Sequence, residues 1–347
     1  MTTQKIQQQQ GQAVLAFFRM LSGGWTARMF QVAAELGIAD LLKDGPKTAA
    51  ELAKATQTHT PSLTRLMRAL VALGVFAEQE PDVYSQTDLS CYLCEDYPGT
   101  LRSFALFSGL DWIWATWREL SYAVKTGQSA MKHAHGMNAW QYLDAHPQES
   151  LIFNKALAEF SALINPSILE SYNFSSFQTL VDVGGGHGSF LMLLLERYPS
   201  LHGILFDRAS VMEEAKALYA QTPFASRCTF VAGNFLTELP SGADVYLFKF
   251  IANDWGDEYL RQMLTVCRNV IPAYGKLLVM EFVLVPQRPT ITATLMDITT
   301  FLSFEGGRGR TELEFRTLFT DAGFTLSRII PTSSGVYILE GVPNSTV

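Results

Sequence analysis

Apolar positions recur with helical spacing through most of the first part of the chain. Between residues 13 and 42 they return every three or four positions, and the run is interrupted at Ser22-Gly23-Gly24. Thr48 and Glu51 have the spacing of a capping box, and a further amphipathic segment covers Pro61–Leu73. The pattern therefore predicts several short helices in succession, with an interruption inside the first long one.

Two short apolar pieces, Val75-Phe76 and Tyr84-Ser85, follow these helices and predict a small hairpin. Helices followed by a small β-wing are typical of a winged helix. DNA-binding domains bring several Lys and Arg side chains to the phosphates, but the predicted helix 61–73 holds only Arg65 and Arg68 as basic residues. We therefore expect this domain to bind protein, and the strongly apolar helices before it favour dimerisation.

Residues 104–165 are predicted to form three helical stretches that are dense in Trp and Phe side chains. Most of these side chains are expected in the core. A helical cap rich in aromatic residues also suits a pocket for a flat apolar substrate, and both roles can hold at once.

From residue 179 onward, apolar runs of strand length alternate with amphipathic helical segments. The predicted strands are Leu180–Val183, Gly203–Phe206, Cys228–Ala232, Asp244–Phe248, Lys276–Phe282, a run near Thr325–Pro331, and Val336–Gly341. This order predicts a Rossmann-like, doubly wound α/β sheet, whose ligands bind at the carboxyl ends of the strands. The chain is thus expected to contain a winged-helix dimerisation domain (1–103), a helical linker and substrate cap (104–165), and an α/β domain (166–347).

The first of these strands runs into a glycine-rich loop, Gly184-Gly185-Gly186-His187-Gly188, which opens an amphipathic helix at Ser189. Glycine can adopt positive φ and lets a ligand approach the main chain at a helix N-terminus. The loop lacks the Gly-Lys-Ser/Thr ending of a P-loop, and Ser189 replaces the third glycine of the dinucleotide fingerprint. Asp207 follows the next strand, where a carboxylate either binds both ribose hydroxyls or caps the next helix. These features favour an adenosine-type ligand without phosphates.

Composition and charge narrow the classes of function. The net charge of −7 and the absence of a basic stripe argue against a nucleic-acid partner. No apolar run reaches the ~18 residues of a membrane span, and the Gln-rich N-terminus does not resemble a signal peptide. We expect a cytoplasmic protein without a membrane partner. Four cysteines, Cys91, Cys94, Cys228 and Cys267, lack a second ligand pair at zinc spacing, so no metal site is expected.

A series of motifs occurs in order along residues 13–342. The series comprises Ala34–Leu42, Glu51-Leu52-Ala53, Arg65–Phe76, Asp182–Gly188, Asp254–Glu258, Gly306-Gly307-Arg308 with Arg310-Thr311, and Glu314-Phe315. It resembles the two-domain, SAM-dependent O-methyltransferases of the caffeic acid and hydroxyindole type and their bacterial natural-product relatives. The resemblance implies S-adenosyl-L-methionine (SAM) as the cofactor, a homodimer, and a small aromatic or polyketide-like substrate.

The resemblance also implies roles for single residues. It assigns the methionine moiety to Gly184, Gly185 and Gly186, the ribose to Asp207, the adenine to Asn234 and Phe235, and closure of the pocket to Lys249. Asn234 departs from the usual Asp, but an amide can still hydrogen-bond adenine. The implied substrate pocket draws on Ser108, Trp112, Leu157, Phe160, Asn253, Thr300 and Phe304.

The catalytic residues show the larger departure from the family pattern. Asn253 stands where the family normally has the histidine that deprotonates the acceptor hydroxyl, and a carboxamide is not basic near neutral pH. Gly309 stands at the position of one of two supporting acids, which leaves Glu281. Burial could raise the pKa of Glu281 and make it a weak base, while Asp254 could accept a hydrogen bond from substrate or cap the next helix.

Three hypotheses follow for the activity. Proximity and in-line orientation can suffice for methyl transfer when the acceptor is an acidic phenol or enol that arrives ionised, with Asn253 orienting it. The fold can instead use SAM without methylating, as a pericyclase-like or hydroxylase-like enzyme in which the sulfonium charge stabilises a polarised transition state. The third is a non-catalytic dimeric regulator. The sequence favours methyl transfer.

Overall fold

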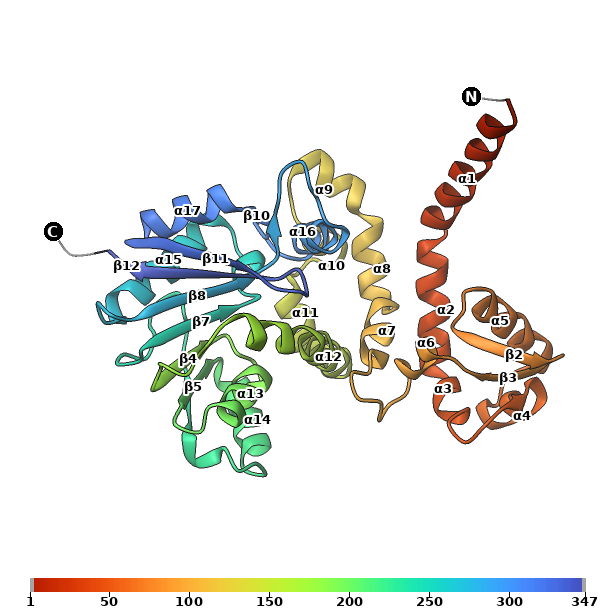
Figure 1. Ribbon diagram of the computed structural model, residues 1–347, viewed down its shortest axis with the longest axis horizontal. Coiled ribbons are helices and arrows are strands. Elements are labelled where there is room, and N and C mark those ends of the chain that lie inside the picture. The colour runs from red at the N-terminus through yellow and green to blue at the C-terminus, as the bar shows by residue number, and fades with distance from the viewer. Residues whose placement is uncertain (1–2, 345–347) are drawn as a thin grey trace. The chain divides into compact units, whose positions relative to one another are not determined.

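The computed structural model describes residues 3–344, with side chains from residue 11 onward. The chain forms two compact units, and Figure 1 labels their helices and strands. The first unit comprises the residues up to 114 together with 146–160, and the second comprises 115–145 and the residues from 161 onward. The predicted cap, 104–165, is therefore divided between the two units, while its role in holding substrate stays a prediction.

The first unit contains short helices and a small antiparallel sheet. Its elements up to residue 91 are α1 (Thr3–Leu21), α2 (Gly23–Glu35), α3 (Ile38–Leu41), β1 (Lys47–Thr48), α4 (Ala49–Thr56), α5 (Thr60–Ala72), β2 (Phe76–Glu80), β3 (Val83–Gln86) and α6 (Asp88–Cys91). The helix break at Ser22 and the capping box of Thr48 and Glu51 are confirmed. The predicted hairpin is also confirmed, and β1 adds a third strand in the order β1-β3-β2.

Helices between residues 102 and 171, a range that the structure describes in full, are shorter and more numerous than predicted. Instead of three stretches there are α7 (Arg102–Ser108), α8 (Asp111–Arg118), α9 (Leu120–Thr126), α10 (Ala130–His135), α11 (Ala139–Ala145) and α12 (Pro147–Ser171). Gly127 and Gly136 end α9 and α10 in the left-handed conformation, with φ of 71° and 70°. The aromatic density of this region concealed these two stop signals in the sequence.

The second unit is built on a seven-stranded sheet with the order β11-β12-β8-β7-β4-β5-β6. Its strands are β4 (Thr179–Val183), β5 (His202–Asp207), β6 (Cys228–Ala232), β7 (Val245–Lys249), β8 (Lys276–Glu281), β11 (Phe324–Pro331) and β12 (Tyr337–Pro343). Five neighbouring strands pair in parallel, in the order β8, β7, β4, β5 and β6. β12 pairs in antiparallel with both β8 and β11. The predicted doubly wound sheet is confirmed.

Helices and short elements connect these strands. They are α13 (Ser189–Arg197), α14 (Ala209–Tyr219), η1 (Ala225–Arg227), η2 (Ala252–Asp254), α15 (Asp257–Val270), β9 (Val283–Leu284), α16 (Ile291–Ser303), β10 (Arg310–Thr311) and α17 (Glu312–Asp321). Buried side chains of α15 and α17 share one core with β4, β7 and β8. Strands that are buried along their length read as continuous apolar runs, which is why the sequence located them well. No helix of the described residues is both long and apolar enough to cross a membrane.

Candidate functional site

The glycine loop lies at the carboxyl end of β4. Positive φ values of 66°, 58° and 73° occur at Gly184, Gly186 and Gly188. A Cβ at Gly184 would lie 2.6 Å from Ile251 Cδ1, and one at Gly185 would lie 2.6 Å from the Asp182 carboxyl group. At Gly186 such an atom would meet nothing within 4 Å. A Cβ at Gly188 would likewise lie 2.6 Å from the Tyr219 hydroxyl. Three loop glycines thus permit close packing against the protein, while Gly186 faces open space, where a ligand can approach the main chain.

Asp207 ends β5 and faces this loop, because β4 and β5 pair in parallel. Its Oδ2 accepts a hydrogen bond from Gly186 N at 2.9 Å, and its Oδ1 accepts one from Arg208 N at 2.7 Å. The N-cap residue of α14 is Arg208, without a side-chain cap. Asp207 is therefore held against the glycine loop and is not the N-cap residue of the helix, while its contact with a ribose stays a prediction.

Asn234 and Phe235 follow the neighbouring strand, β6. Gly233 N donates to Asp207 O at 3.1 Å, so this segment begins beside the end of β5. The Asn234 carboxamide oxygen accepts from Leu236 N at 3.0 Å. The Asn234 NH2 group is therefore the part of the amide turned away from this backbone contact. The Phe235 ring meets the Trp255 ring edge-on, with centroids 5.7 Å apart.

Lys249 ends β7 and is enclosed by aromatic rings and buried acids. Its Nζ lies 5.4 Å from the Phe190 ring centroid and donates to Ser161 Oγ on α12. Burial lowers the pKa of Lys249 to about 8, against the opposing effect of Asp182 and Glu281. Burial raises the pKa of Asp182 to about 7, an effect that Lys249 reduces. Lys249 thus interacts electrostatically with one acid beside the glycine loop and another at the end of β8.

Asn253, in the middle of η2, and Glu281, at the end of β8, form a buried pair. The Asn253 backbone N donates to Glu281 Oε1 at 3.2 Å. The Asn253 side chain is 9% exposed, and its Oδ1 and the Oε2 of Glu281 are buried without a hydrogen bond to any described residue. Buried polar atoms normally have a hydrogen-bond partner, so these two oxygens suit contact with a polar group of a ligand.

The two carboxyl groups of this region are held largely in the neutral form at neutral pH. Burial raises the pKa of Glu281 to about 8, with a further increase from Asp254, while the N–H of Asn253 opposes the shift. Burial also raises the pKa of Asp254 to about 8. The N-cap residue of α15 is Gly256, so Asp254 does not cap that helix. Raised carboxyl pKa values are frequent in catalytic sites, although structural networks also produce them.

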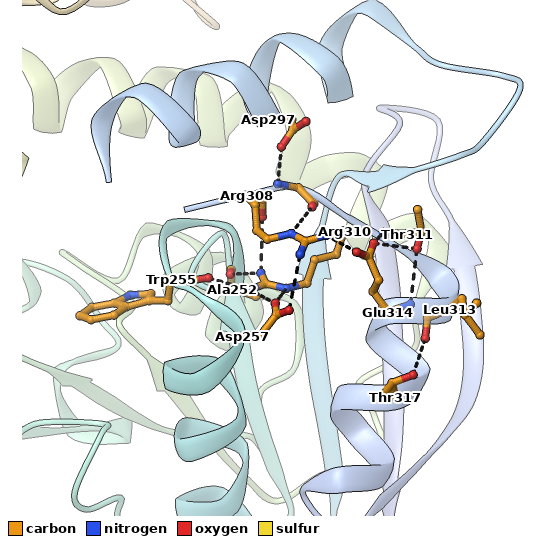
Figure 2. A network of polar contacts seen from close by, with 11 residues as sticks. Ala252, Trp255, Asp257, Asp297, Arg308, Arg310, Thr311, Leu313, Glu314 and Thr317 are labelled. Atoms are coloured by element: carbon orange, nitrogen blue, oxygen red, sulfur yellow. Dashed lines mark hydrogen bonds and ion pairs between the residues drawn. The ribbon is translucent and has the colours of Figure 1, made fainter. Parts of the chain in front are cut away.

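A network of arginines holds the η2 loop in place (Figure 2). Arg310 donates to Ala252 O at 2.5 Å and to Trp255 O at 2.6 Å, and its Nε bonds Asp257 Oδ1 at 2.8 Å. Arg308 N donates to Asn253 O at 2.8 Å. The sequence motifs included both arginines but suggested no role for either, because their partners in the η2 segment and at Asp257 lie more than 50 residues away along the chain.

The predicted second acid is absent at Gly309, and the structure shows what lies beside that position. Gly309 N donates to Asp297 Oδ1 at 2.7 Å. A Cβ at Gly309 would approach Asp297 Cβ and Leu284 Cδ1 to 3.1 Å each. The Asp297 carboxylate on α16 therefore lies next to the backbone of Gly309. The sequence did not predict a role for Asp297 or Ser161, or the burial of Asp182, because each depends on contacts between segments that are distant along the chain.

The predicted substrate residues fall in both units. Ser108 ends α7, Trp112 lies on α8, and Leu157 and Phe160 lie on α12, all in the first unit. There the Phe107 ring meets the Trp112 ring at 5.9 Å, and Phe104 stacks on Phe160 at 5.9 Å between centroids. The aromatic residues of α7, α8 and α12 thus pack on one another, but only Trp112 and Phe153 among them are buried, and Phe104 is 38% exposed. The prediction that most of them lie in the core is therefore not confirmed in the single chain. Their contact with substrate stays a prediction.

Thr300 and Phe304 belong to α16 and its C-cap in the second unit. The Thr300 hydroxyl donates to Met296 O and Asp297 O, at 3.0 Å each, so its hydrogen serves the helix. The Phe304 ring packs against Trp140 at 5.4 Å. Phe304 therefore presents an aromatic surface, whereas Thr300 offers a ligand at most an oxygen lone pair. Within the described residues, no group of three His, Cys, Asp or Glu side chains is arranged to hold a metal ion.

Comparison with known proteins agrees with this architecture. A model of the O-methyltransferase domain matches residues 117–325, and one of the O-methyltransferase dimerisation domain matches residues 18–96. The chain is 36% identical to the phenazine O-methyltransferase PhzM of Lysobacter antibioticus, over 94% of this chain and 95% of that protein. It is 35% identical to the mitomycin biosynthesis 6-O-methyltransferase of Streptomyces lavendulae, over 92% of each.

A solved structure shows a similar fold. CalO1, a methyltransferase in calicheamicin biosynthesis determined in its SAH-bound form, matches with a TM-score of 0.84 and 33% identity. The match covers 96% of this chain and 98% of CalO1. The family that the motifs indicated is confirmed, and the chain belongs to the O-methyltransferase family.

Proposed function

We propose that the protein is a SAM-dependent O-methyltransferase that methylates a hydroxyl group of a small aromatic or polyketide-like secondary metabolite. One observation carries this proposal. In the second unit, the loop that faces Asp207 packs through Gly184 against Ile251, two residues before Asn253. A nucleoside site and a buried polar site thus share one edge of the sheet, as a transfer between two ligands requires. The natural-product O-methyltransferases among the relatives support the same reaction.

The residues at the sheet edge fit SAM. Each oxygen of Asp207 receives one backbone N–H, so lone pairs remain for the two ribose hydroxyls. The Asn234 NH2 group is available to donate to a ring nitrogen of adenine, and Phe235 supplies an adjacent aromatic ring. When bound, SAM supplies an electrophilic methyl group, whose bond to sulfur breaks as a bond to the acceptor oxygen forms.

Asn253 is proposed to orient the acceptor. Its carboxamide oxygen, buried and free of hydrogen bonds to described residues, can accept a hydrogen bond from a hydroxyl group, and its NH2 group can donate to a phenolate. Because the amide cannot take a proton, the acceptor either arrives ionised or gives its proton to another group. Glu281 Oε2 is the adjacent candidate, since the pKa of Glu281 is about 8. Asp254 is proposed to act indirectly, because its charge raises the pKa of Glu281 at pH values where Asp254 is ionised.

The proposal also includes the cellular compartment and the oligomeric state of the enzyme. Cys91, Cys94, Cys228 and Cys267 are free thiols, which persist in a reducing compartment, so we propose that the enzyme acts in the cytoplasm. The dimerisation-domain match supports a homodimer that forms through residues 18–96.

The test combines binding and turnover. Calorimetric titration with SAM and with S-adenosylhomocysteine measures the cofactor site, and incubation with SAM and a panel of hydroxyaromatic compounds measures the reaction by mass spectrometry. We expect methylated product and S-adenosylhomocysteine in equal amounts. A product that forms without loss of SAM would instead indicate the pericyclase-like or hydroxylase-like activity, which the comparisons do not favour. Failure to bind either nucleoside would indicate the non-catalytic regulator.

A further inference from the structure

Arg310 is a buried cation whose hydrogen-bonding capacity is almost fully used. The whole residue is only 1% exposed, although its position on the short strand β10 is next to a loop. A guanidinium group that is removed from water is destabilising unless its donors are paired. Here Nε and both Nη atoms are bonded, to Asp257, Ala252 O, Trp255 O and, at 3.4 Å, Arg308 O. Such complete pairing indicates a site with a defined geometry.

The partners of Arg310 lie on both sides of Asn253. Ala252 O precedes Asn253, and Trp255 O follows it by two residues, so one rigid guanidinium fixes both ends of the η2 turn. The backbone of Asn253 itself is held by Glu281 Oε1 and by Arg308 N. All these contacts use backbone atoms, and they leave Asn253 Oδ1 and Glu281 Oε2 available.

The same segment also connects to the glycine loop and to β8. β10 pairs in parallel with β9, where Arg310 lies opposite Val283, two residues after Glu281. At the other end of the η2 segment, the Ile251 side chain packs where a Cβ of Gly184 would lie. A shift of the turn would therefore move the acceptor-side oxygens relative to the cofactor loop.

We propose that Arg310 is a positioning residue for methyl transfer, which sets the orientation of Asn253 toward the acceptor hydroxyl by fixing Ala252 and Trp255. This inference rests on the proposed function. Displacement of a reacting group by about 1 Å can reduce a rate about 10²-fold. The contribution of Arg310 is therefore expected in kcat, with a much smaller effect on cofactor affinity, since Asp207 lies on another strand.

The first test is Arg310→Lys, which keeps the positive charge and removes the planar fork. We expect kcat to fall about 10²-fold while the dissociation constant for S-adenosylhomocysteine stays within a factor of about three of the wild-type value. The matched control is Arg316→Lys on α17. Arg316 also binds a carboxylate and a carbonyl, Glu312 and Leu326 O, but at the surface. Its kcat should remain at the wild-type value.

The second test is the pH profile of kcat in Arg310→Met. Arg310 contributes to lowering the pKa of Glu281, so its removal should move the acid limb of the profile to higher pH. A purely structural role would reduce the folded fraction and leave the profile of the remaining enzyme unchanged. If the Met variant does not fold, Asp257→Asn provides the same comparison of kcat, because Asp257 is half-exposed and anchors the guanidinium from one side.

The outcomes separate this inference from the proposed function. Wild-type turnover together with an unchanged kcat per folded molecule in Arg310→Lys and Asp257→Asn would overturn the positioning role alone. Absence of any wild-type methyl transfer across the acceptor panel would overturn the proposed function and the positioning role with it. A fall in kcat that is matched by Arg316→Lys would also contradict the proposal, because the effect would then not be specific to the η2 turn.

Discussion

Asn253 is the residue at which this chain departs most from its family pattern, and it allows a direct gain-of-function prediction. Asn253→His places an imidazole beside Glu281, whose carboxyl group can orient it. A positioned general base contributes about 10² to 10⁴ in rate, so we expect kcat for weakly acidic phenols to rise about 10²-fold. Acceptors that are already ionised should gain little. The measurement is kcat across phenols of similar shape and different pKa.

A control separates orientation from proton transfer at the same position. Asn253→Ala removes the amide and adds no base, so it should lower turnover of the ionised acceptors as well. If Asn253→His raised turnover equally for acidic and weakly acidic phenols, the wild-type enzyme would not depend on an acidic acceptor, and the role proposed for Asn253 would be wrong.

Glu281 predicts a specific dependence of stability on pH. Its pKa is about 8 in the folded protein and near 4.5 when unperturbed. Between these values the folded protein holds a proton that the unfolded chain releases, so the free energy of unfolding falls as pH rises from about 4.5 to 8. One pKa unit corresponds to about 1.4 kcal/mol, so the decrease amounts to a few kcal/mol at most. Glu281→Gln stays neutral and should reduce this decline in melting curves from pH 5 to 9, whereas the raised pKa values of Asp182 and Asp254 should retain the remainder.

The matched control for stability is Glu196→Gln, which replaces an exposed carboxyl group on α13. Its melting temperature should follow the wild-type pH dependence. Turnover supplies a second readout, because loss of a rise in kcat near pH 8 in Glu281→Gln would indicate that Glu281 accepts the proton. An unchanged pH profile of both stability and kcat would contradict the perturbed pKa and the proton-transfer role together.

Single residues were predictable where a local pattern fixes their position. Asp207 and Lys249 each end a buried apolar strand, and ligand sites in such sheets lie at strand ends. Arg310 was not assigned a role, because its partners Ala252 and Trp255 are 58 and 55 residues distant along the chain. Ser161, the partner of Lys249, is separated from it by 88 residues. No local pattern distinguishes that serine from any other.

At the scale of elements, two glycines with positive φ allow the effect of backbone strain on stability to be distinguished from an effect on cofactor affinity. Gly184 has positive φ, and a Cβ there would displace Ile251. Gly242 also has positive φ, 87°, but a Cβ there meets nothing within 4 Å. Left-handed backbone costs about 1–2 kcal/mol for alanine, so both Gly→Ala variants should lose stability by that amount. Only Gly184→Ala should weaken binding of S-adenosylhomocysteine, about tenfold or more.

Calorimetry on both variants decides this prediction. Equal affinities in Gly184→Ala and Gly242→Ala would mean that the contact between the loop and Ile251 has no effect on the cofactor. A large loss in Gly242→Ala would show that global destabilisation, and not the loop, controls binding. Either result would contradict the proposed coupling between the glycine loop and the segment that carries Asn253.

Elements were predicted best where burial is uniform. β4 and β5 were predicted to within one residue at each boundary, because central strands are apolar on both faces. β6 was also located at both ends, although it is the edge strand of the sheet and none of its residues is fully buried. The helices between residues 102 and 171 were predicted poorly. Their ends depend on single glycines such as Gly127 and Gly136, whose left-handed conformation follows from local geometry that aromatic periodicity does not reveal.

At the scale of the whole molecule, the exposed apolar side chains at the start of the chain require a partner. Val14, Phe17, Phe18 and Leu21 on α1 are all more than half exposed in the single chain. Their spacing of three or four residues places them along one side of the helix. Trp25 on α2 is also 68% exposed. Contiguous apolar surface of this kind marks an association site, and the dimerisation-domain match begins at residue 18.

The corresponding prediction is that Phe17→Glu with Phe18→Glu converts the homodimer to monomer. Burial of a Phe side chain contributes about 1.5–3 kcal/mol, and a symmetric interface loses it twice for each substitution. The dissociation constant should therefore rise by several orders of magnitude, which sedimentation velocity measures directly.

Gln12→Glu is the matched control, because it adds a charge to α1 at an exposed polar position and should leave the dimer intact. Since these substitutions lie in the first unit and the proposed cofactor residues in the second, the monomer should still bind S-adenosylhomocysteine. A dimer that survives both Phe substitutions would show that the contact surface lies elsewhere within residues 18–96.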